Sequence, residues 1–223
     1  FANTGLTSIP VGLFSNFGGT PTNRLFQGTF QNTEISNIPD TLFMGIKGDA
    51  SQPLGEYIFA NTFEGTDITS IPAGLFSSVR GTPSVGMFSN TFAYTKITSI
   101  PENLFSTISG APAKFMFQRT FASTPITSIP KDLFVSIKGD PAESMFASTF
   151  ESCKSLSGQI PGSLFANISG APVYGMFMST FKNSSGLSSW IPPELFRGIK
   201  TEGFITGQMS DVFLGTGILE QCP

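Results

Sequence analysis

The dipeptide Ile-Pro, followed by two variable residues and Leu-Phe, recurs seven times along this chain of 223 residues. Successive prolines are 29, 33, 29, 29, 31 and 31 residues apart, so the unit has 29 residues with short insertions. A fixed period of about 20 to 50 residues is typical of stacked repeats, in which each unit buries its apolar face only against its neighbours. We therefore expect a solenoid, with functional residues arranged in columns. The prolines are Pro10, Pro39, Pro72, Pro101, Pro130, Pro161 and Pro192.

The insertions fall in three intervals, between Gly48 and Phe59, between Phe150 and Ile160, and between Phe181 and Ile191. The apolar positions on either side of each insertion keep their spacing. Because a loop can lengthen at little entropic cost whereas a core position cannot shift, these insertions are predicted to lie in loops.

Phenylalanine is the residue that the repeat places most regularly. Of 24 phenylalanines, 21 occupy three positions of the unit, and Phe17, Phe115 and Phe204 lie outside the pattern. We expect three columns of stacked rings in a core shared between coils. The first column is Phe14, Phe43, Phe76, Phe105, Phe134, Phe165 and Phe196; the second is Phe26, Phe59, Phe88, Phe117, Phe146 and Phe177; the third is Phe1, Phe30, Phe63, Phe92, Phe121, Phe150, Phe181 and Phe213.

Local spacing suggests the elements of one unit. The phenylalanines of residues 87–92 are four apart, which favours a helical turn, and residues 104–108 follow a proline that suits a helix start. The branched residues of 95–100 favour a short strand, which would pair in parallel with its neighbours, and residues 110–112 are predicted to turn the chain. A strand on the F-x-x-T-F segment is an alternative. The fold class expected is an α/β repeat solenoid of about 7 to 8 repeats.

These motifs resemble a known family. The pattern T-F-x-x-T-x-I-T-S-I-P-x-x-L-F-x-x-I is similar to a leucine-rich repeat, and residues 149–156, which include Cys153, are closest to the BspA-like (Treponema pallidum-type) class. The resemblance implies a leucine-rich-repeat-like solenoid over residues 1–200, followed at 201–223 by a degenerate eighth repeat or C-terminal cap. It also implies a bacterial cell-surface or secreted protein that mediates adhesion or protein binding, without a shared active site.

Composition limits the function further. Charged residues make up 12% of the chain and the net charge is -3, which argues against nucleic-acid binding because that requires clustered Lys and Arg. No apolar run approaches the roughly 18 residues of a membrane span.

Cys153 replaces the Thr of other coils and lies more than two coils from Cys222, so we expect both thiols to be free. Phe1 is already a column position, so the chain is expected to begin inside a repeat.

Catalytic chemistry is not expected. The chain has no histidine, which removes the commonest general base and metal ligand. Its carboxylates are scattered singly, and stacking should set Asp67 beside Lys96 of the next coil rather than beside a second acid. We predict no enzyme activity, no metal and no cofactor.

A binding role would rest on variable exposed residues beside the predicted strands, with aromatic anchors of the kind favoured at interfaces. The partner would be a host or bacterial surface protein or a glycan. One alternative is a structural spacer, stacked end to end on further repeats; another is ice binding by a hydroxyl column that runs from Thr7 to Ser188. The candidate ligand-binding residues are Glu34, Asp67, Tyr94, Lys96, Lys154 and Trp190.

Overall fold

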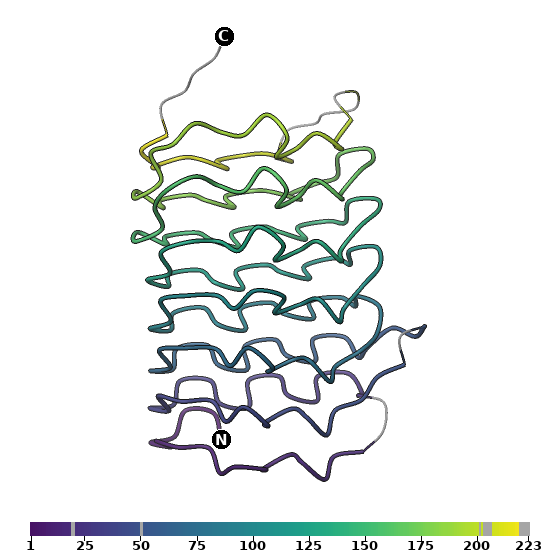
Figure 1. Cartoon of the computed structure of the whole chain (residues 1–223), viewed down its shortest axis with the longest axis vertical. Helices are drawn as coiled ribbons and strands as arrows, with labels where there is room; N and C mark the ends of the chain where they lie inside the picture. Colours follow the sequence, from purple (N-terminus) through teal and green to yellow (C-terminus); the bar gives the residue numbers. More distant parts are fainter. Residues whose placement is uncertain (19–20, 50, 201, 203–206, 219–223) are drawn as a thin grey trace.

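The computed structural model describes residues 1–18, 21–49, 51–200, 202 and 207–218. The chain winds in successive layers along the long axis of the molecule, with its first residues at one end and residues 207–218 at the other (Figure 1). Each layer, here called a coil, begins with a turn segment of nine residues and continues into an Ile-Pro segment. Coils 1 to 7 start at Arg24, Tyr57, Gly86, Phe115, Ser144, Gly175 and Gly207, and residues 1–18 form a partial coil 0.

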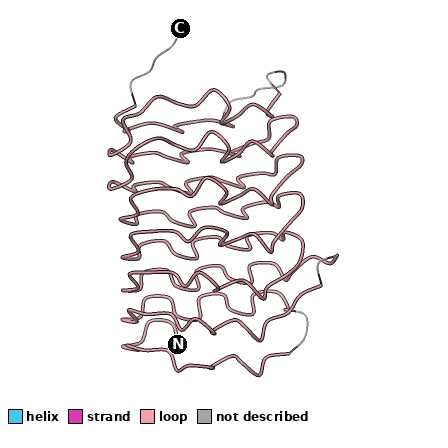
Figure 2. Cartoon of the chain, viewed as in Figure 1, coloured by secondary structure: helices cyan, strands magenta, loops and turns pink. Residues whose placement is uncertain are grey.

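The described residues contain neither a helix nor an extended strand, so the helical turns and strands expected from the sequence are not formed as regular elements (Figure 2). The turn segment of coil 3 shows why. Gly86, Asn90 and Tyr94 all have positive φ, of 59°, 53° and 58°. A left-handed residue at every fourth position interrupts a right-handed helix. The four-residue spacing of the phenylalanines thus comes from consecutive reverse turns, not from a helix.

Hydrogen bonds in the turn segment alternate in direction. The N–H groups of Phe88 and Asn90 donate to Met116 O and Gln118 O of the next coil, at 2.9 and 2.8 Å. Those of Ser89 and Thr91 donate within the coil, at 3.0 and 3.2 Å. Every second peptide therefore joins two coils, and the others close turns.

The Ile-Pro segment is likewise built from turns. In coil 3, Ser106 N–H donates to Asn103 O at 3.0 Å and Ile108 N–H to Phe105 O at 3.1 Å. Residues 104–108, expected to be helical, are turns ending in a single bridge residue.

Parallel pairing occurs at a different place from the one expected. The isolated bridges are Pro53 with Thr82, Gly81 with Ile108, Gly110 with Ile137, Gly139 with Ile168, and Gly170 with Ile199. They lie beside the G-x-P segment, which the sequence predicts only as a turn. In residues 95–100, by contrast, two exposed residues separate the buried Ile97 and Ile100. A strand turns alternate side chains to opposite faces, so this spacing does not fit one.

The three phenylalanine columns are confirmed. Neighbouring rings of the second column lie 5.5–5.7 Å apart, and those of the first 5.9–6.3 Å, with nearly parallel planes. The third column continues to Phe213, 5.5 Å from Phe181. Rings of the first column lie tilted between rings of the second, as where Phe105 sits 4.6 Å from Phe88 and 5.0 Å from Phe117. Offset stacking of this kind adds to the burial energy of each ring.

Buried threonines complete the backbone hydrogen bonding around these rings. Thr149 Oγ1 lies 2.8 Å from Phe146 O of its own coil and 2.9 Å from Phe117 O of the preceding coil. Thr120 Oγ1 donates to Phe88 O at 2.8 Å. Among the described residues no buried side-chain nitrogen or oxygen lacks a partner.

Replacing Thr120 by Val tests this threonine column. The substitution keeps the shape of the side chain but removes the hydroxyl that donates to Phe88 O, which then accepts only the N–H of Thr91, at 3.2 Å. We expect the free energy of unfolding in urea to fall by about 0.5 to 1.5 kcal/mol. Thr98→Val, at an exposed threonine of the neighbouring coil, should change it by less than about 0.5 kcal/mol. Equal effects would show that the buried hydroxyl contributes nothing.

Gly86 occupies a position that coils 1, 2, 4 and 5 give to the larger residues Arg24, Tyr57, Phe115 and Ser144, and the structure explains the glycine here. A Cβ on Gly86 would lie 2.2 Å from Cε1 of the Tyr57 ring, which covers it from the preceding coil. The Arg24 guanidinium in turn lies 5.5 Å from the centre of the Tyr57 ring. The absence of a side chain at Gly86 thus allows an aromatic ring to lie flat along the stack.

Gly86→Ala should therefore destabilise the chain by more than Gly158→Ala. Gly158 has φ +81° and no atom within 4 Å of a built Cβ, so alanine there meets only backbone strain, about 1 to 2 kcal/mol. Gly5→Ala, free of both effects, is the neutral control. Chemical unfolding measures the loss of stability in all three variants. When the chain also carries Tyr57→Ala, Gly86→Ala should destabilise it no more than Gly158→Ala does, because the ring that the new Cβ would meet is gone. No recovery would mean that the ring is not the cause.

Candidate functional site

The edge of the stack where each turn segment ends carries most of the predicted binding residues. Glu34, Asp67 and Lys96 each follow the buried threonine that closes the turn segment. Asp67 Oδ1 and Lys96 Nζ are 2.8 Å apart, which confirms the expected neighbourhood of these two residues. Both side chains are about half exposed or more, so the ion pair adds little stability and both groups remain open to a partner.

A second group of side chains begins with Tyr94, two residues before Lys96 in the same coil. Arg119 of coil 4 lies with its Cζ 5.7 Å from the centre of the Tyr94 ring of coil 3, and its Nη2 donates a hydrogen bond to the Tyr94 hydroxyl. Its Nη1 is 3.2 Å from Glu151 Oε2 of coil 5. One guanidinium thereby connects three consecutive coils. The Tyr94 ring, half exposed, presents a flat apolar surface held in place by a cation.

A shallow hollow completes this region, which we call the corner cluster: Asp67, Tyr94, Lys96, Arg119, Glu151 and Lys154. The hollow is lined by Ser123, Thr124, Pro125, Ser152, Lys154 and Ser155. Lys154 is exposed and forms no ion pair with any described residue. The hollow thus offers hydroxyl groups and one uncompensated positive charge.

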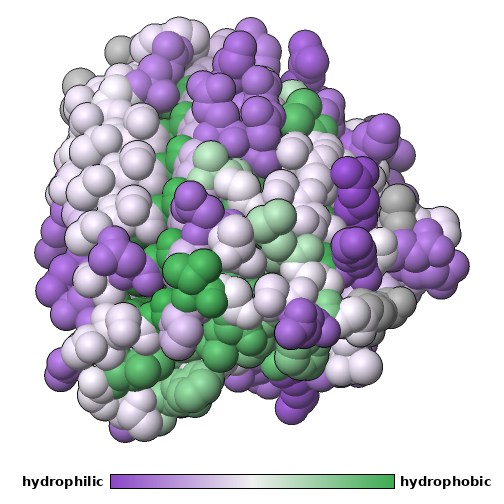
Figure 3. Space-filling model, turned by 60° about the horizontal axis from the view of Figure 1, so that its bottom comes forward, coloured by the Kyte–Doolittle hydropathy of each residue, from purple (hydrophilic) through white to green (hydrophobic). Residues whose placement is uncertain are grey.

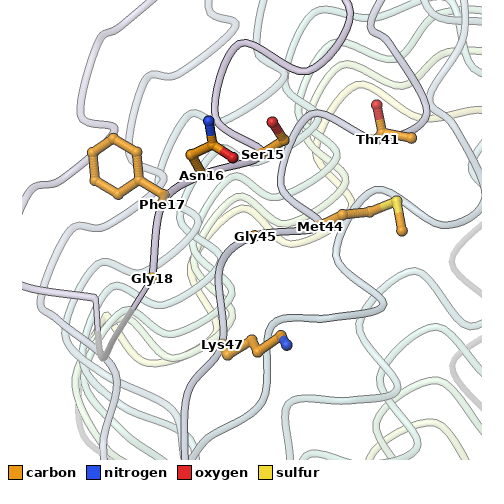
Figure 4. A pocket seen from close by; sticks show the side chains of 8 residues that line it. All are labelled: Ser15, Asn16, Phe17, Gly18, Thr41, Met44, Gly45 and Lys47. Atoms are coloured by element: carbon orange, nitrogen blue, oxygen red, sulfur yellow. The ribbon is translucent and has the colours of Figure 1, made fainter.

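The remaining hollows carry less chemistry. One near the N-terminal end is lined by Ser15, Asn16, Phe17, Gly18, Thr41, Met44, Gly45 and Lys47. Figure 4 shows that Phe17 points away from Met44 and Lys47, and that Met44 and Lys47 extend from well-separated points of the chain without converging. Binding sites usually hold a few polar groups that converge on one point, and this hollow has none.

Not all predicted residues come together. Asp67, Tyr94, Lys96 and Lys154 lie in the corner cluster. Glu34, exposed at the same edge, has no ion pair among the described residues, and Trp190, 55% exposed, lies in a different part of coil 6. Arg119 and Glu151 were not among the residues predicted from the sequence, because the spacing of the turn segment was interpreted as helical. Three outward positions four residues apart, as in Phe115, Arg119 and Ser123, are the signal that would have found them.

The ionisable groups elsewhere are ordinary surface groups. Hydrogen bonds from the backbone and side chain of Ser51 lower the pKa of Asp49, and a hydrogen bond to Asp211 raises that of Lys182. Within the part of the chain that the structure describes, no three His, Cys, Asp or Glu residues are close enough to hold a metal ion.

Cys153 is free and fully buried, in the column that other coils fill with threonine. Its Sγ lies 3.1 Å from Phe121 O and 3.5 Å from Thr124 Oγ1, and its N–H donates to Ser184 Oγ. Burial raises the pKa of the thiol from 9.0 to about 11. The thiol is therefore protonated and unreactive at neutral pH. Cys222 lies outside the described residues.

This raised pKa predicts a loss of stability in alkali. Below pH 9 the thiol is protonated in both states, whereas between pH 9 and about 11 only the unfolded chain releases the proton. At about 1.4 kcal/mol per pH unit, the free energy of unfolding should fall by roughly 3 kcal/mol across this window. Cys153→Thr should lack this component of the decline, since threonine does not ionise. Denaturant unfolding of both chains at several pH values measures the difference, and parallel profiles would contradict the prediction.

Comparison with known proteins gave no match to a protein-family model and no significant match to a curated protein. The described residues form no helix long and apolar enough to cross a membrane.

Proposed function

We propose that this chain is a non-enzymatic binding module of a bacterial cell-surface or secreted protein, built as a repeat solenoid similar to the BspA-like leucine-rich repeat class. Its role is adhesion, through recognition of a host or bacterial surface protein or glycan at the corner cluster. It uses no cofactor and binds no nucleic acid. The resemblance to the BspA-like class supports the extracellular location, and the low content of charged residues agrees with it.

The observation that carries this proposal is the gathering of side chains from coils 2 to 5 at one edge. They comprise an exposed aromatic ring held by Arg119, an exposed ion pair between Asp67 and Lys96, and Lys154, which has no ion pair among the described residues and lines a hydroxyl-rich hollow. Tyrosine and arginine are the residues that most often dominate binding energy at interfaces. A spacer without a ligand requires no such grouping, and a uniform hydroxyl-rich surface would serve it equally well.

Binding of the intact chain to immobilised extracellular-matrix proteins, bacterial surface proteins and a glycan array tests the proposal. Tyr94→Ala combined with Arg119→Ala should weaken any specific interaction at least tenfold, because it removes both the ring and the cation that holds it. The matched control is Tyr174→Ala, which removes a similarly exposed tyrosine directly before the turn segment of coil 6.

Two results would overturn this assignment. If no component binds, the alternative of a structural spacer in a larger surface protein or fibre replaces it. If a component binds equally well to the double variant and to the control, binding occurs at another surface.

A further inference from the structure

The hollow of the corner cluster follows from two local features of the sequence. Coil 4 has Pro125 where coils 3 and 5 have Lys96 and Lys154, so a short side chain lies between two long ones. Coil 5 also carries one extra residue here, Ser155, within one of the insertions predicted to lie in loops. The resulting hollow has a volume of about 440 Å³, in the lower part of the roughly 300 to 1,000 Å³ that is typical of small-molecule sites.

The loop that carries Lys154 is fixed by its own turns and by the next coil. Lys154 N–H donates to Ser152 O and Leu156 N–H donates to Cys153 O, both at 3.0 Å. Gly186 of coil 6 lies against this loop, because a Cβ built on Gly186 would be 2.8 Å from Lys154 O and closer still to Leu156 O. The backbone of the loop is therefore ordered before any ligand arrives, which lowers the entropic cost of binding.

The polar groups of the hollow are available to a ligand. The hydroxyls of Ser123, Ser152 and Ser155 form no hydrogen bond with any described residue, and Lys154 forms no ion pair with one. Thr124 differs, since its hydroxyl donates to Phe121 O at 2.7 Å. Three hydroxyl donors beside one ammonium group fit an anionic oxygen group, which only accepts hydrogen bonds.

The charges of the corner cluster also favour an anion. Its two acids are each paired with a cation, Asp67 with Lys96 at 2.8 Å and Glu151 with Arg119 at 3.2 Å. Lys154 is the remaining charge, so the cluster is positive in a chain whose net charge is -3. An anionic ligand is thus attracted to this place and repelled by the rest of the molecule.

An aromatic ring stands next to this anion site along the stack. Tyr94, Ser123 and Ser152 are the ninth residues of the turn segments in coils 3, 4 and 5, so they form one column. The buried phenylalanines of these coils lie 5.7 Å apart from one coil to the next. The ring and the hollow are therefore one to two such steps apart, a distance comparable to the length of one or two pyranose rings.

These groups fit a sugar better than an acidic protein. One face of a pyranose ring carries mainly C–H groups, which pack on an aromatic ring, and its edges carry hydroxyls. The buried centre of a protein interface is instead its most apolar part. Figure 3 shows hydrophobic residues gathered at the end of the stack that is turned forward, and mostly neutral and hydrophilic residues on the flank. A single ring among hydroxyls and charges thus favours a glycan.

We propose that the ligand of the corner cluster is an acidic glycan. Its anionic group, a carboxylate or a sulfate, accepts hydrogen bonds from Lys154 Nζ and from the hydroxyls of the hollow. A neighbouring sugar ring of the same glycan packs on Tyr94, which Arg119 holds in place. This assignment rests on the proposed binding function and names the class of its ligand.

Calorimetric titration of the whole chain with four soluble polymers, at physiological ionic strength, tests the assignment. Hyaluronan carries carboxylates without sulfates, and dextran sulfate carries sulfates without carboxylates. Dextran is a neutral glycan, and polyglutamate carries carboxylates without sugar. We expect binding to hyaluronan, to dextran sulfate or to both, which identifies the anionic group, and at least about tenfold weaker binding to the other two polymers. The affinity should fall as salt is added, because salt screens the exposed charge of Lys154.

Lys154→Gln removes the charge and keeps nearly the length of the side chain. It should weaken binding at least about tenfold, because a hydrogen bond to a charged group contributes more than one between neutral groups. Lys138→Gln is the matched control, since Lys138 is also exposed and has no ion pair among the described residues, and it should bind like the natural chain. Circular dichroism establishes that both variants are folded.

Several outcomes would overturn the acidic glycan and still leave the binding function standing. Equal binding of polyglutamate would point to an acidic protein, and equal binding of dextran to a neutral glycan. If Lys154→Gln binds as Lys138→Gln does, the anion site is wrong, even where Tyr94→Ala with Arg119→Ala abolishes binding. If none of the four polymers binds, the acidic glycan is also excluded, whereas binding to a surface protein that depends on Tyr94 and Arg119 would keep the proposed function.

Discussion

The structure depends on how the turn segment divides its backbone hydrogen bonds. Alternate N–H groups close reverse turns within a coil, and the others reach the carbonyls of the next coil, as Phe88 reaches Met116. No buried peptide group can be left without a partner at low cost, so a coil with one neighbour is satisfied on one side only. The stack therefore acquires a direction, and with it two chemically different ends.

The backbone path also determines which side chains are buried and which are exposed. The left-handed residues at every fourth position face outward, as Tyr94 does, whereas the phenylalanine between two of them is buried together with its neighbours, such as Thr91 and Ala93 beside Phe92. The rings stack because successive coils bring equivalent residues together. The buried threonine hydroxyls add a second hydrogen bond, from the next coil, to carbonyls that already accept an N–H within their own turn, such as Phe88 O and Phe117 O. The outward positions are free to vary, which is why Tyr94, Arg119 and Glu151 can meet from three different coils without disturbing the core.

Several features could be predicted from the sequence because they depend on spacing alone. The three columns, the neighbourhood of Asp67 and Lys96 and the threonine-like position of Cys153 all follow from the period. The helical turns and the strand at 95–100 were wrong, because phenylalanines four residues apart fit both a helix and a series of four-residue turns. The distinction lies in the sign of φ at residues such as Tyr57, Phe115 and Arg119, whose types do not favour the left-handed region.

The sequence by itself determined which residues share a column and which are buried, since any stacking of equivalent units brings equivalent residues together. Only the tertiary structure decided the path of the backbone within a coil, because left-handed conformation at residues such as Arg119 is maintained by hydrogen bonds to neighbouring coils, here to Ala147 O. That path places Arg119 beside Tyr94 and Glu151. The corner cluster could not be read from the chain because its members are joined across coils, through outward positions that exist only once the turns have formed.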